Sequence, residues 1–233
     1  MIRMDNRFQK ITTVEKLLDF FHDGMTLMYG GFGGVGSPPT LIDAILQMGV
    51  KDLILIGNDT GFPHIGIGQI VSQGRAKQIT TSHIGSNPVA GELMTAGKMK
   101  VEFCPQGILA ERIRAGGMGI PAILSDIGMD NEIVTNGKQI CTIDDKQYLI
   151  EAALTAEVSI VYAKKADPYG NLIYDKSARN TNPVCAMAGE ITIAEVEEIV
   201  PLGSLNPEEI VTPGVFVDYI VPSQGVNWKW AWE

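Results

Sequence analysis

The chain has 233 residues, of which 45% are hydrophobic and 19% are charged, and this length and composition predict one domain spanning residues 1–233. Its 18 basic and 27 acidic residues leave a net charge of −9, which argues against a nucleic-acid or anionic-membrane surface. The hydrophobic content is too high for a disordered chain, and no apolar run approaches the length of about 18 residues that a membrane-spanning helix needs.

Strand-like and helix-like segments alternate along the chain. This pattern predicts an α/β fold with an open, mostly parallel, Rossmann-like sheet flanked by helices. We expect helices at residues 13–22, 40–48, 64–72, 92–96 and 107–115. We expect strands at residues 25–29, 52–56, 100–103, 159–163, 191–196 and 216–221, and a turn at residues 207–210. Residues 25–56 form a βαβ unit, which implies parallel strands joined by a right-handed crossover.

The cysteines and histidines indicate a cytoplasmic protein without a catalytic metal. Cys104, Cys141 and Cys185 are an odd number of cysteines without a CxxC pair, so we expect free thiols in a reducing compartment. Cys185 has no basic neighbour in the sequence and is interpreted as a buried thiol. The first residues lack the apolar segment of a signal peptide, and the histidines have no metal-ligand spacing.

A glycine-rich segment between the first expected strand and helix is the strongest candidate binding site. Residues 31–36 match the GxGxxG pattern, in which backbone N–H groups can approach an anion closely. A tight turn that binds nothing is the alternative interpretation. The candidate ligand-binding residues are Gly30, Gly31, Phe32, Gly33, Gly34, Val35 and Gly36.

An NAD(P)-binding oxidoreductase is one hypothesis for this segment, but it meets two difficulties. The acid that binds the ribose belongs at the end of the second strand, whereas Asp52 lies at its start and Asp59 lies beyond its end. Pro38 and Pro39 also stand where a dinucleotide-binding helix offers its first N–H groups, and proline lacks that donor. Nicotinamide binding remains an alternative.

Three longer segments indicate a different function. Residues 23–38 read DGMTLMYGGFGGVGSP, residues 105–121 read PQGILAERIRAGGMGIP, and residues 212–218 read TPGVFVD. In this order they resemble the motifs of alpha subunits of the family I coenzyme A transferases, most closely those acting on short-chain acyl and 3-oxoacid substrates. The resemblance covers nearly the whole chain.

The resemblance implies a ping-pong transfer of coenzyme A (CoA) between an acyl-CoA and a carboxylate such as acetate, butyrate or acetoacetate, with no cofactor besides these substrates. In the family, a glutamate in a Ser-Glu-Asn-Gly motif of the beta subunit forms the glutamyl-CoA thioester. This chain lacks that motif, since its Asn136-Gly137 follows Thr135. We therefore expect a hetero-oligomer with a beta subunit, α2β2 or a multiple. A non-catalytic CoA-binding assembly subunit is the further alternative.

Gln106 lies in the second motif, where the resemblance implies that its amide faces the catalytic carboxylate. A glutamine amide both donates and accepts, which suits the orientation of a carboxylate or a thioester oxygen. Capping of the following helix is the alternative interpretation. Further candidates in loops after strand-like segments are Asn58, Ser82, His83, Gly85 and Asn87, of which His83 is interpreted as a surface or packing residue.

Three other features have mainly structural interpretations. Glu111 and Arg114 have i, i+3 spacing and are expected to pair, while Arg112 and Arg114 remain candidates for CoA phosphates. Thr181 stands where relatives commonly have an aromatic residue, which bears on the acyl pocket. Residues 228–233 carry three alternating tryptophans, which we expect to pack on a partner chain or to complete a sheet edge.

Overall fold

The computed structural model describes residues 6–226 and 228. Its α-helices are α1 (Pro39–Met48), α2 (Gly68–Ser72), α3 (Pro88–Thr95), α4 (Gln106–Gly117), α5 (Glu132–Thr135) and α6 (Asn182–Ala188). Short 3-10 helices are η1 (Val14–Phe20), η2 (Lys176–Arg179), η3 (Pro207–Glu209) and η4 (Gly214–Phe216). The strands are β1 (Thr26–Tyr29), β2 (Leu53–Ile56), β3 (Ala76–Thr81), β4 (Lys100–Phe103), β5 (Ala122–Ser125), β6 (Ile140–Ile143), β7 (Lys146–Ala152), β8 (Ala156–Ala166), β9 (Leu172–Ile173), β10 (Gly189–Ile199) and β11 (Tyr219–Pro222).

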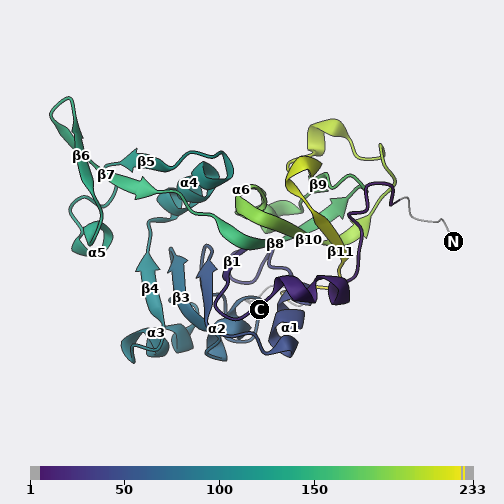
Figure 1. The fold of residues 1–233 in the computed structure, drawn as a ribbon, viewed down its shortest axis with the longest axis horizontal. Helices are drawn as coiled ribbons and strands as arrows, with labels where there is room; N and C mark the ends of the chain where they lie inside the picture. Colours follow the sequence, from purple (N-terminus) through teal and green to yellow (C-terminus); the bar gives the residue numbers. More distant parts are fainter. Residues whose placement is uncertain (1–5, 227, 229–233) are drawn as a thin grey trace.

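The main sheet has the strand order β11-β10-β8-β1-β2-β3-β4, and every neighbouring pair in this order is parallel. Strand β9 adds an antiparallel pairing to β8. Helices cover both faces of this sheet, with α1, α2 and α3 on one side and α4 and α6 on the other (Figure 1). The predicted fold class, an open and mostly parallel sheet flanked by helices, is confirmed.

The strand sequences explain why both faces are covered. Leu27 and Met28 are consecutive in β1 and point to opposite faces, and both are fully buried. Leu27 packs in the cluster that includes Leu41 of α1, whereas Met28 packs in the cluster that includes Leu109 of α4. A strand buried on both faces has a continuous apolar sequence, which is why this unit was predictable without alternation.

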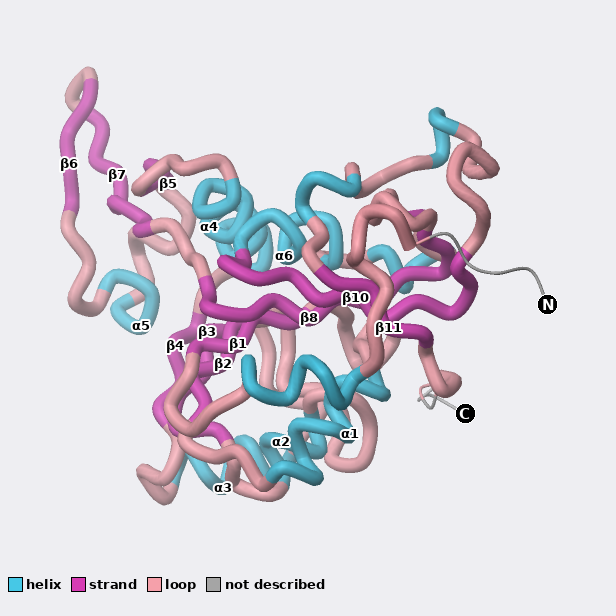
Figure 2. Tube along the Cα trace, turned by 45° about the vertical axis from the view of Figure 1, so that its right-hand side comes forward, coloured by secondary structure: helices cyan, strands magenta, loops and turns pink. Residues whose placement is uncertain are grey.

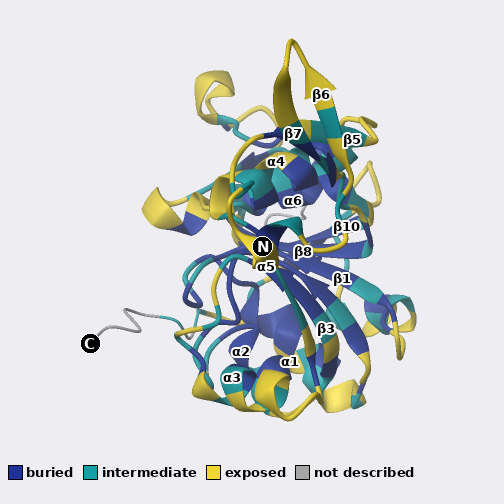
Figure 3. Cartoon of the chain, turned by 90° about the vertical axis from the view of Figure 1, so that its left-hand side faces the viewer, coloured by how far each residue is buried: buried dark blue, intermediate teal, exposed yellow. Residues whose placement is uncertain are grey.

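A second, three-stranded antiparallel sheet has the order β5-β7-β6 and lies beside the β4 edge of the main sheet (Figure 2). Its β6–β7 hairpin projects outward and is largely exposed (Figure 3). The turn of this hairpin places Asp144 and Asp145 at φ +48° and +63°, the left-handed conformation of a two-residue hairpin turn. The sequence analysis missed this sheet, because its half-exposed strands lack long apolar runs.

Several boundaries differ from expectation. Strand β3 was not predicted, since Lys77, Gln78 and the threonines interrupt its apolar character. Residues 13–22 contain a 3-10 helix, η1, in place of an α-helix. Helix α2 begins at Gly68 because Phe62 and Ile65 pair across a tight turn before it. Strand β11 begins at Tyr219 because η4 precedes it.

Candidate functional site

The candidate site lies where strands β1 to β4 end. Because parallel strands place their carboxyl ends at one edge of the sheet, the residues that follow these strands come together there. Gly30 follows β1, Asn58 follows β2, Ser82 follows β3, and Gln106 begins α4 after β4. The sequence-predicted glycine loop and Gln106 thus lie after strands of the same sheet edge.

The Gln106 side chain is directed to β2 and does not cap its own helix. Its Nε2 donates to Asn58 Oδ1 at 3.0 Å, although the two residues are 48 positions apart. Ser82 Oγ lies 2.8 Å from the same Asn58 oxygen and 2.7 Å from the Asn58 carbonyl. Asn58 is buried, whereas Gln106 is exposed. This arrangement leaves the Gln106 carbonyl oxygen and its second N–H available to a ligand.

The glycine loop, residues 30–36, is a closed turn. The backbones of Phe32 and Val35 exchange two hydrogen bonds of 3.0 Å each, which makes these two partly exposed residues the tip of the loop. The backbone N–H groups of Gly31, Gly34 and Gly36 have no acceptor among the described residues, although all three glycines are buried. Buried N–H groups without an acceptor are suited to a bound oxyanion or water.

Packing also demands glycine at two positions of this loop. A Cβ at Gly30 lies 1.9 Å from the Oδ1 atom of Asn182, and a Cβ at Gly36 lies 2.4 Å from the carbonyl oxygen of Ala178. Gly36 in addition has φ +82°, which L-residues rarely adopt. The turn interpretation thus accounts for these two glycines, and ligand binding by residues 30–36 remains a prediction.

Two buried side chains hold the glycine loop from opposite sides. Asp59 Oδ2 accepts the N–H of Gly33 at 2.9 Å, and burial raises the pKa of this carboxyl. Asn182 Nδ2 donates to the Gly36 carbonyl at 2.9 Å, while its Oδ1 accepts the N–H of Tyr162 at 3.0 Å. The sequence analysis assigned Asp59 only a doubtful ribose-binding role, and the structure instead places it in the support of the loop.

The N-terminus of helix α1 is already occupied by a carboxylate of the chain itself. Glu195 of β10 is fully buried and accepts the Leu41 N–H at 3.2 Å and the Thr40 hydroxyl at 2.7 Å, while Ser223 donates to it at 2.6 Å. A pyrophosphate at this helix end meets a fixed negative charge in addition to two prolines. This geometry disfavours the NAD(P) hypothesis.

Glu195 predicts a pH dependence of stability. Burial raises its pKa above the unfolded value, so ionisation of Glu195 destabilises the fold and this contribution to stability is lost as pH rises through the folded pKa. We expect Glu195→Gln to reduce the difference in unfolding free energy between pH 5 and pH 8 by on the order of 1 kcal/mol. Urea denaturation at both pH values checks this. An equal or larger pH difference in the variant contradicts it.

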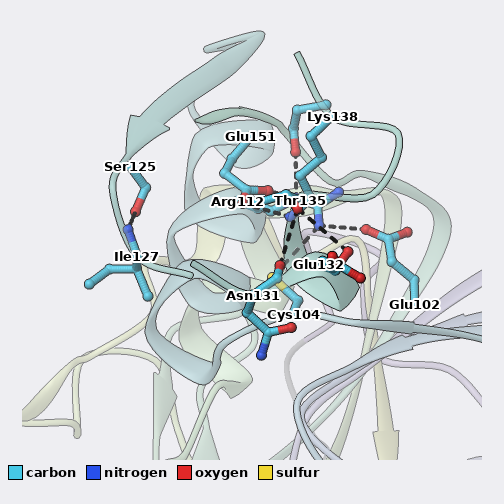
Figure 4. Close-up of polar contacts among 11 residues, drawn as sticks. Glu102, Cys104, Arg112, Ser125, Ile127, Asn131, Glu132, Thr135, Lys138 and Glu151 are labelled. Carbon is cyan, nitrogen blue, oxygen red and sulfur yellow. Dashed lines mark hydrogen bonds and ion pairs between the residues drawn. The ribbon is translucent and has the colours of Figure 1, made fainter. Parts of the chain in front are cut away.

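The arginines of α4 lie in structural ion pairs, as expected for Arg114. Arg114 pairs with Glu111 at 2.8 Å on the surface. Arg112 is buried, donates to Glu102 at 2.7 Å and lies 3.8 Å from the fully buried Glu151 of β7 (Figure 4). These groups line a cleft of about 750 Å³ between β4 and the smaller sheet, away from the glycine loop. Arg112 therefore joins the two sheets.

The cysteines differ in accessibility as the sequence suggested for Cys185. Cys104 and Cys185 are buried, and burial raises the pKa of Cys185 to about 12, while Cys141 is half-buried. We expect one thiol, that of Cys141, to react rapidly with a thiol reagent at pH 8, and all three to react in denaturant. Ellman titration measures this, with Cys141→Ser as the control. A second rapid thiol in the native protein contradicts the prediction.

His83 and the tryptophan tail have packing contacts. The exposed His83 ring lies 6.4 Å from the Phe32 ring, centroid to centroid, beside the loop tip. Trp228 Nε1 donates to the Ser37 carbonyl at 3.0 Å, and its ring packs edge-on against Tyr162 at 5.2 Å. Trp228 thus contacts its own chain, not a partner. The remainder of the predicted tail interface, residues 229–233, lies outside the described residues.

Neither a metal site nor a membrane span emerges from the part of the chain that the structure describes. No three His, Cys, Asp or Glu side chains within residues 6–226 and 228 gather in a way that could hold a metal ion. Over the same residues, no helix combines the length and apolar character needed to cross a bilayer.

Residues 11–223 match the sequence profile of the coenzyme A transferase family. The chain belongs to this family. The family and the enzyme class predicted from the three sequence motifs are confirmed. The coenzyme A transferase is 57% identical over 226 residues to the alpha chain of a probable coenzyme A transferase of Bacillus subtilis, covering 97% of this chain and 99% of the relative. It is 46% identical to the alpha chain of acetate CoA-transferase of Escherichia coli, covering 92% and 97%.

Other relatives extend the comparison to further substrates and to solved structures. One of the subunits of the succinyl-CoA:3-ketoacid coenzyme A transferase of Helicobacter pylori is 42% identical, over 90% of each chain. The acyl-CoA transferase YdiF of E. coli O157:H7 superposes with a TM-score of 0.83 at 24% identity over 95% of this chain, which spans about half (49%) of that chain. Glutaconate coenzyme A-transferase of Acidaminococcus fermentans has a TM-score of 0.79 at 18% identity, covering 91% and 75%. These two structures support the fold.

The structure adds site residues that the sequence analysis did not select. Asp59, Asn182 and Glu195 support the glycine loop and its helix, and Asn180 contacts Asn58, whose Nδ2 donates to Asn180 Oδ1 at 3.4 Å. Asn180 and Asn182 flank Thr181, so this motif was noted only for its missing aromatic residue. Nothing in the sequence near Glu195 signals its role, because β10 reaches α1 only through the fold.

Proposed function

We propose that this chain is the alpha subunit of a heteromeric CoA-transferase that moves CoA between a short-chain acyl-CoA and a carboxylate such as acetate, butyrate or a 3-oxoacid. The relatives that it matches from end to end include chains named as alpha subunits of CoA-transferases. A cytoplasmic location and an α2β2 assembly, or a multiple of it, are part of the proposal, and the free cysteines agree with a reducing compartment.

The composition of the candidate site carries this proposal. The described side chains where β2, β3 and β4 end are the amides of Asn58 and Gln106, the Ser82 hydroxyl and the exposed His83 imidazole. The carboxylate beside them, Asp59, is buried and accepts the Gly33 N–H. This site can orient a carboxylate and stabilise an oxyanion, but it presents no free carboxylate nucleophile. We therefore assign the nucleophile to the partner subunit.

In the proposed reaction, the partner's glutamate attacks the thioester carbonyl and expels the CoA thiolate, which leaves an acyl-glutamyl anhydride. The thiolate then attacks the glutamyl carbonyl, releases the acyl carboxylate and forms a glutamyl-CoA thioester. The acceptor carboxylate reverses these two steps. Each attack forms a tetrahedral oxyanion, for which the loop N–H groups of Gly31, Gly34 and Gly36 and the amide of Gln106 are the candidate donors.

The test is reconstitution with the beta chain encoded next to this one. We expect the complex to transfer CoA from butyryl-CoA to acetoacetate, and either chain alone to be inactive. Mass spectrometry of the complex after incubation with butyryl-CoA should find the hydroxylamine-sensitive CoA adduct on the partner chain. Activity of this chain alone, or an adduct on it, contradicts the proposal. A complex that binds CoA without turnover of any acyl donor favours the alternative of a non-catalytic assembly protein.

A further inference from the structure

Asn180 has a strained backbone at the border of the candidate site. It lies between η2 and α6 with φ +36° and ψ −132°, outside the small left-handed region that L-residues tolerate. Its side chain is exposed, so core packing does not impose this conformation. Strain of this kind costs stability and is concentrated at functional sites, where it holds a group in place.

The strained conformation directs the Asn180 amide oxygen to three donors. Oδ1 of Asn180 accepts the N–H of Thr181 at 2.8 Å and the hydroxyl of Thr181 at 3.2 Å. It also accepts Asn58 Nδ2 at 3.4 Å. A backbone N–H cannot reverse its role, so the Thr181 N–H requires that the oxygen, and not the nitrogen, of the Asn180 amide faces it.

This requirement passes along a chain of amides. The Asn180 oxygen attracts the nitrogen of Asn58, which turns the Asn58 oxygen toward Gln106 Nε2 at 3.0 Å. The Ser82 hydroxyl, at 2.8 Å from that oxygen, supports the same orientation. Gln106 consequently directs its nitrogen inward, and its carbonyl oxygen and second N–H stay free. Each amide in the chain has one orientation that satisfies all its partners.

We infer that Asn180 is a positioning residue that sets the amide orientation of Gln106 through Asn58. The inference rests on the proposed function, because the value of a fixed Gln106 amide lies in orienting a carboxylate or a thioester oxygen. The 3.4 Å step between Asn58 and Asn180 is the longest in the chain of amides. Such hydrogen bonds are often long in ligand-free enzymes and shorten when the substrate binds.

The test compares Asn180→Gly with Lys176→Gly in the reconstituted complex. Both variants place glycine at an exposed residue with positive φ in the same segment, φ +36° and +48°, and therefore relieve backbone strain. Only Asn180→Gly removes the amide. We expect both variants to keep or raise the thermal unfolding midpoint, and Asn180→Gly alone to lower kcat about tenfold with KM changed less than about twofold, the range seen when one orienting contact is lost.

A double-mutant cycle separates positioning from a purely structural role. If Asn180 acts through Gln106, Asn180→Gly costs almost nothing further in a Gln106→Ala background. Equal losses in both backgrounds overturn the inference, as does an unchanged kcat in Asn180→Gly or a matching loss in Lys176→Gly. Asn180→Ser gives the same comparison if the glycine variant fails to fold. A wild-type complex without CoA exchange contradicts the proposed function itself and is distinguishable from all these results.

Discussion

Replacing Arg112 with alanine should lower the free energy of unfolding by about 3 kcal/mol, because it leaves buried carboxylates without their counter-ion. Arg112 Nη1 donates to Glu102 at 2.7 Å, and its Nε donates to the Ala152 carbonyl at 2.7 Å (Figure 4). Glu151 keeps the Lys138 ammonium at 2.6 Å, which places the loss at the lower end for buried ion pairs. Urea denaturation measures the change, and a loss below about 1 kcal/mol contradicts the role assigned to Arg112.

Arg114→Ala is the matched control, since this residue of the same helix pairs with Glu111 on the surface and should change stability little. The effect at Arg112 should also depend on pH. Burial opposes ionisation of Glu102, but Arg112 outweighs burial and lowers its pKa. This stabilising contribution is present above the unfolded pKa and is lost as pH falls through the folded pKa, so the difference between wild type and Arg112→Ala should narrow in acid.

Replacing Gln106 with alanine should lower kcat for CoA exchange by about 10²- to 10³-fold in the reconstituted complex, the usual cost of losing one preorganised donor. The side chain is exposed and bonded only to Asn58 among the described residues, so the fold should tolerate its removal. Steady-state kinetics with butyryl-CoA and acetoacetate measures the loss. KM should change little, because the contact acts mainly in the transition state.

Glu111→Ala is the control for this variant, because Glu111 lies on the same helix and its carboxylate bonds to Arg114 on the surface. We expect its kcat to equal that of the wild type. A Gln106→Ala complex that retains kcat within about threefold removes Gln106 from the proposed oxyanion donors. An equal loss in Glu111→Ala points to a general disturbance of α4.

The candidate site shows where sequence reasoning succeeded and where it stopped. Residues 30–36 and Gln106 were predicted because they lie in contiguous motifs, each following a strand. Asn58 was a candidate by position alone, and its contact with Gln106 spans 48 positions that no local pattern relates. Glu195 was not considered, since its partners Thr40 and Leu41 lie more than 150 positions away. Contacts of this range exist only after the sheet has formed.

The sequence by itself determined the fold class, because apolar strands buried on both faces and the glycine turns between them encode a parallel sheet locally. It also determined the family, through motifs whose residues are adjacent in the chain, and it indicated that the nucleophile lies elsewhere. Only the tertiary structure decided what the parts contact. It placed a carboxylate at the α1 N-terminus, assigned Arg112 to the junction of two sheets, and joined Gln106 to Asn58 and Asn180. Hydrogen bonds between distant strand ends depend on strand order and register, which the whole core sets and no single segment encodes.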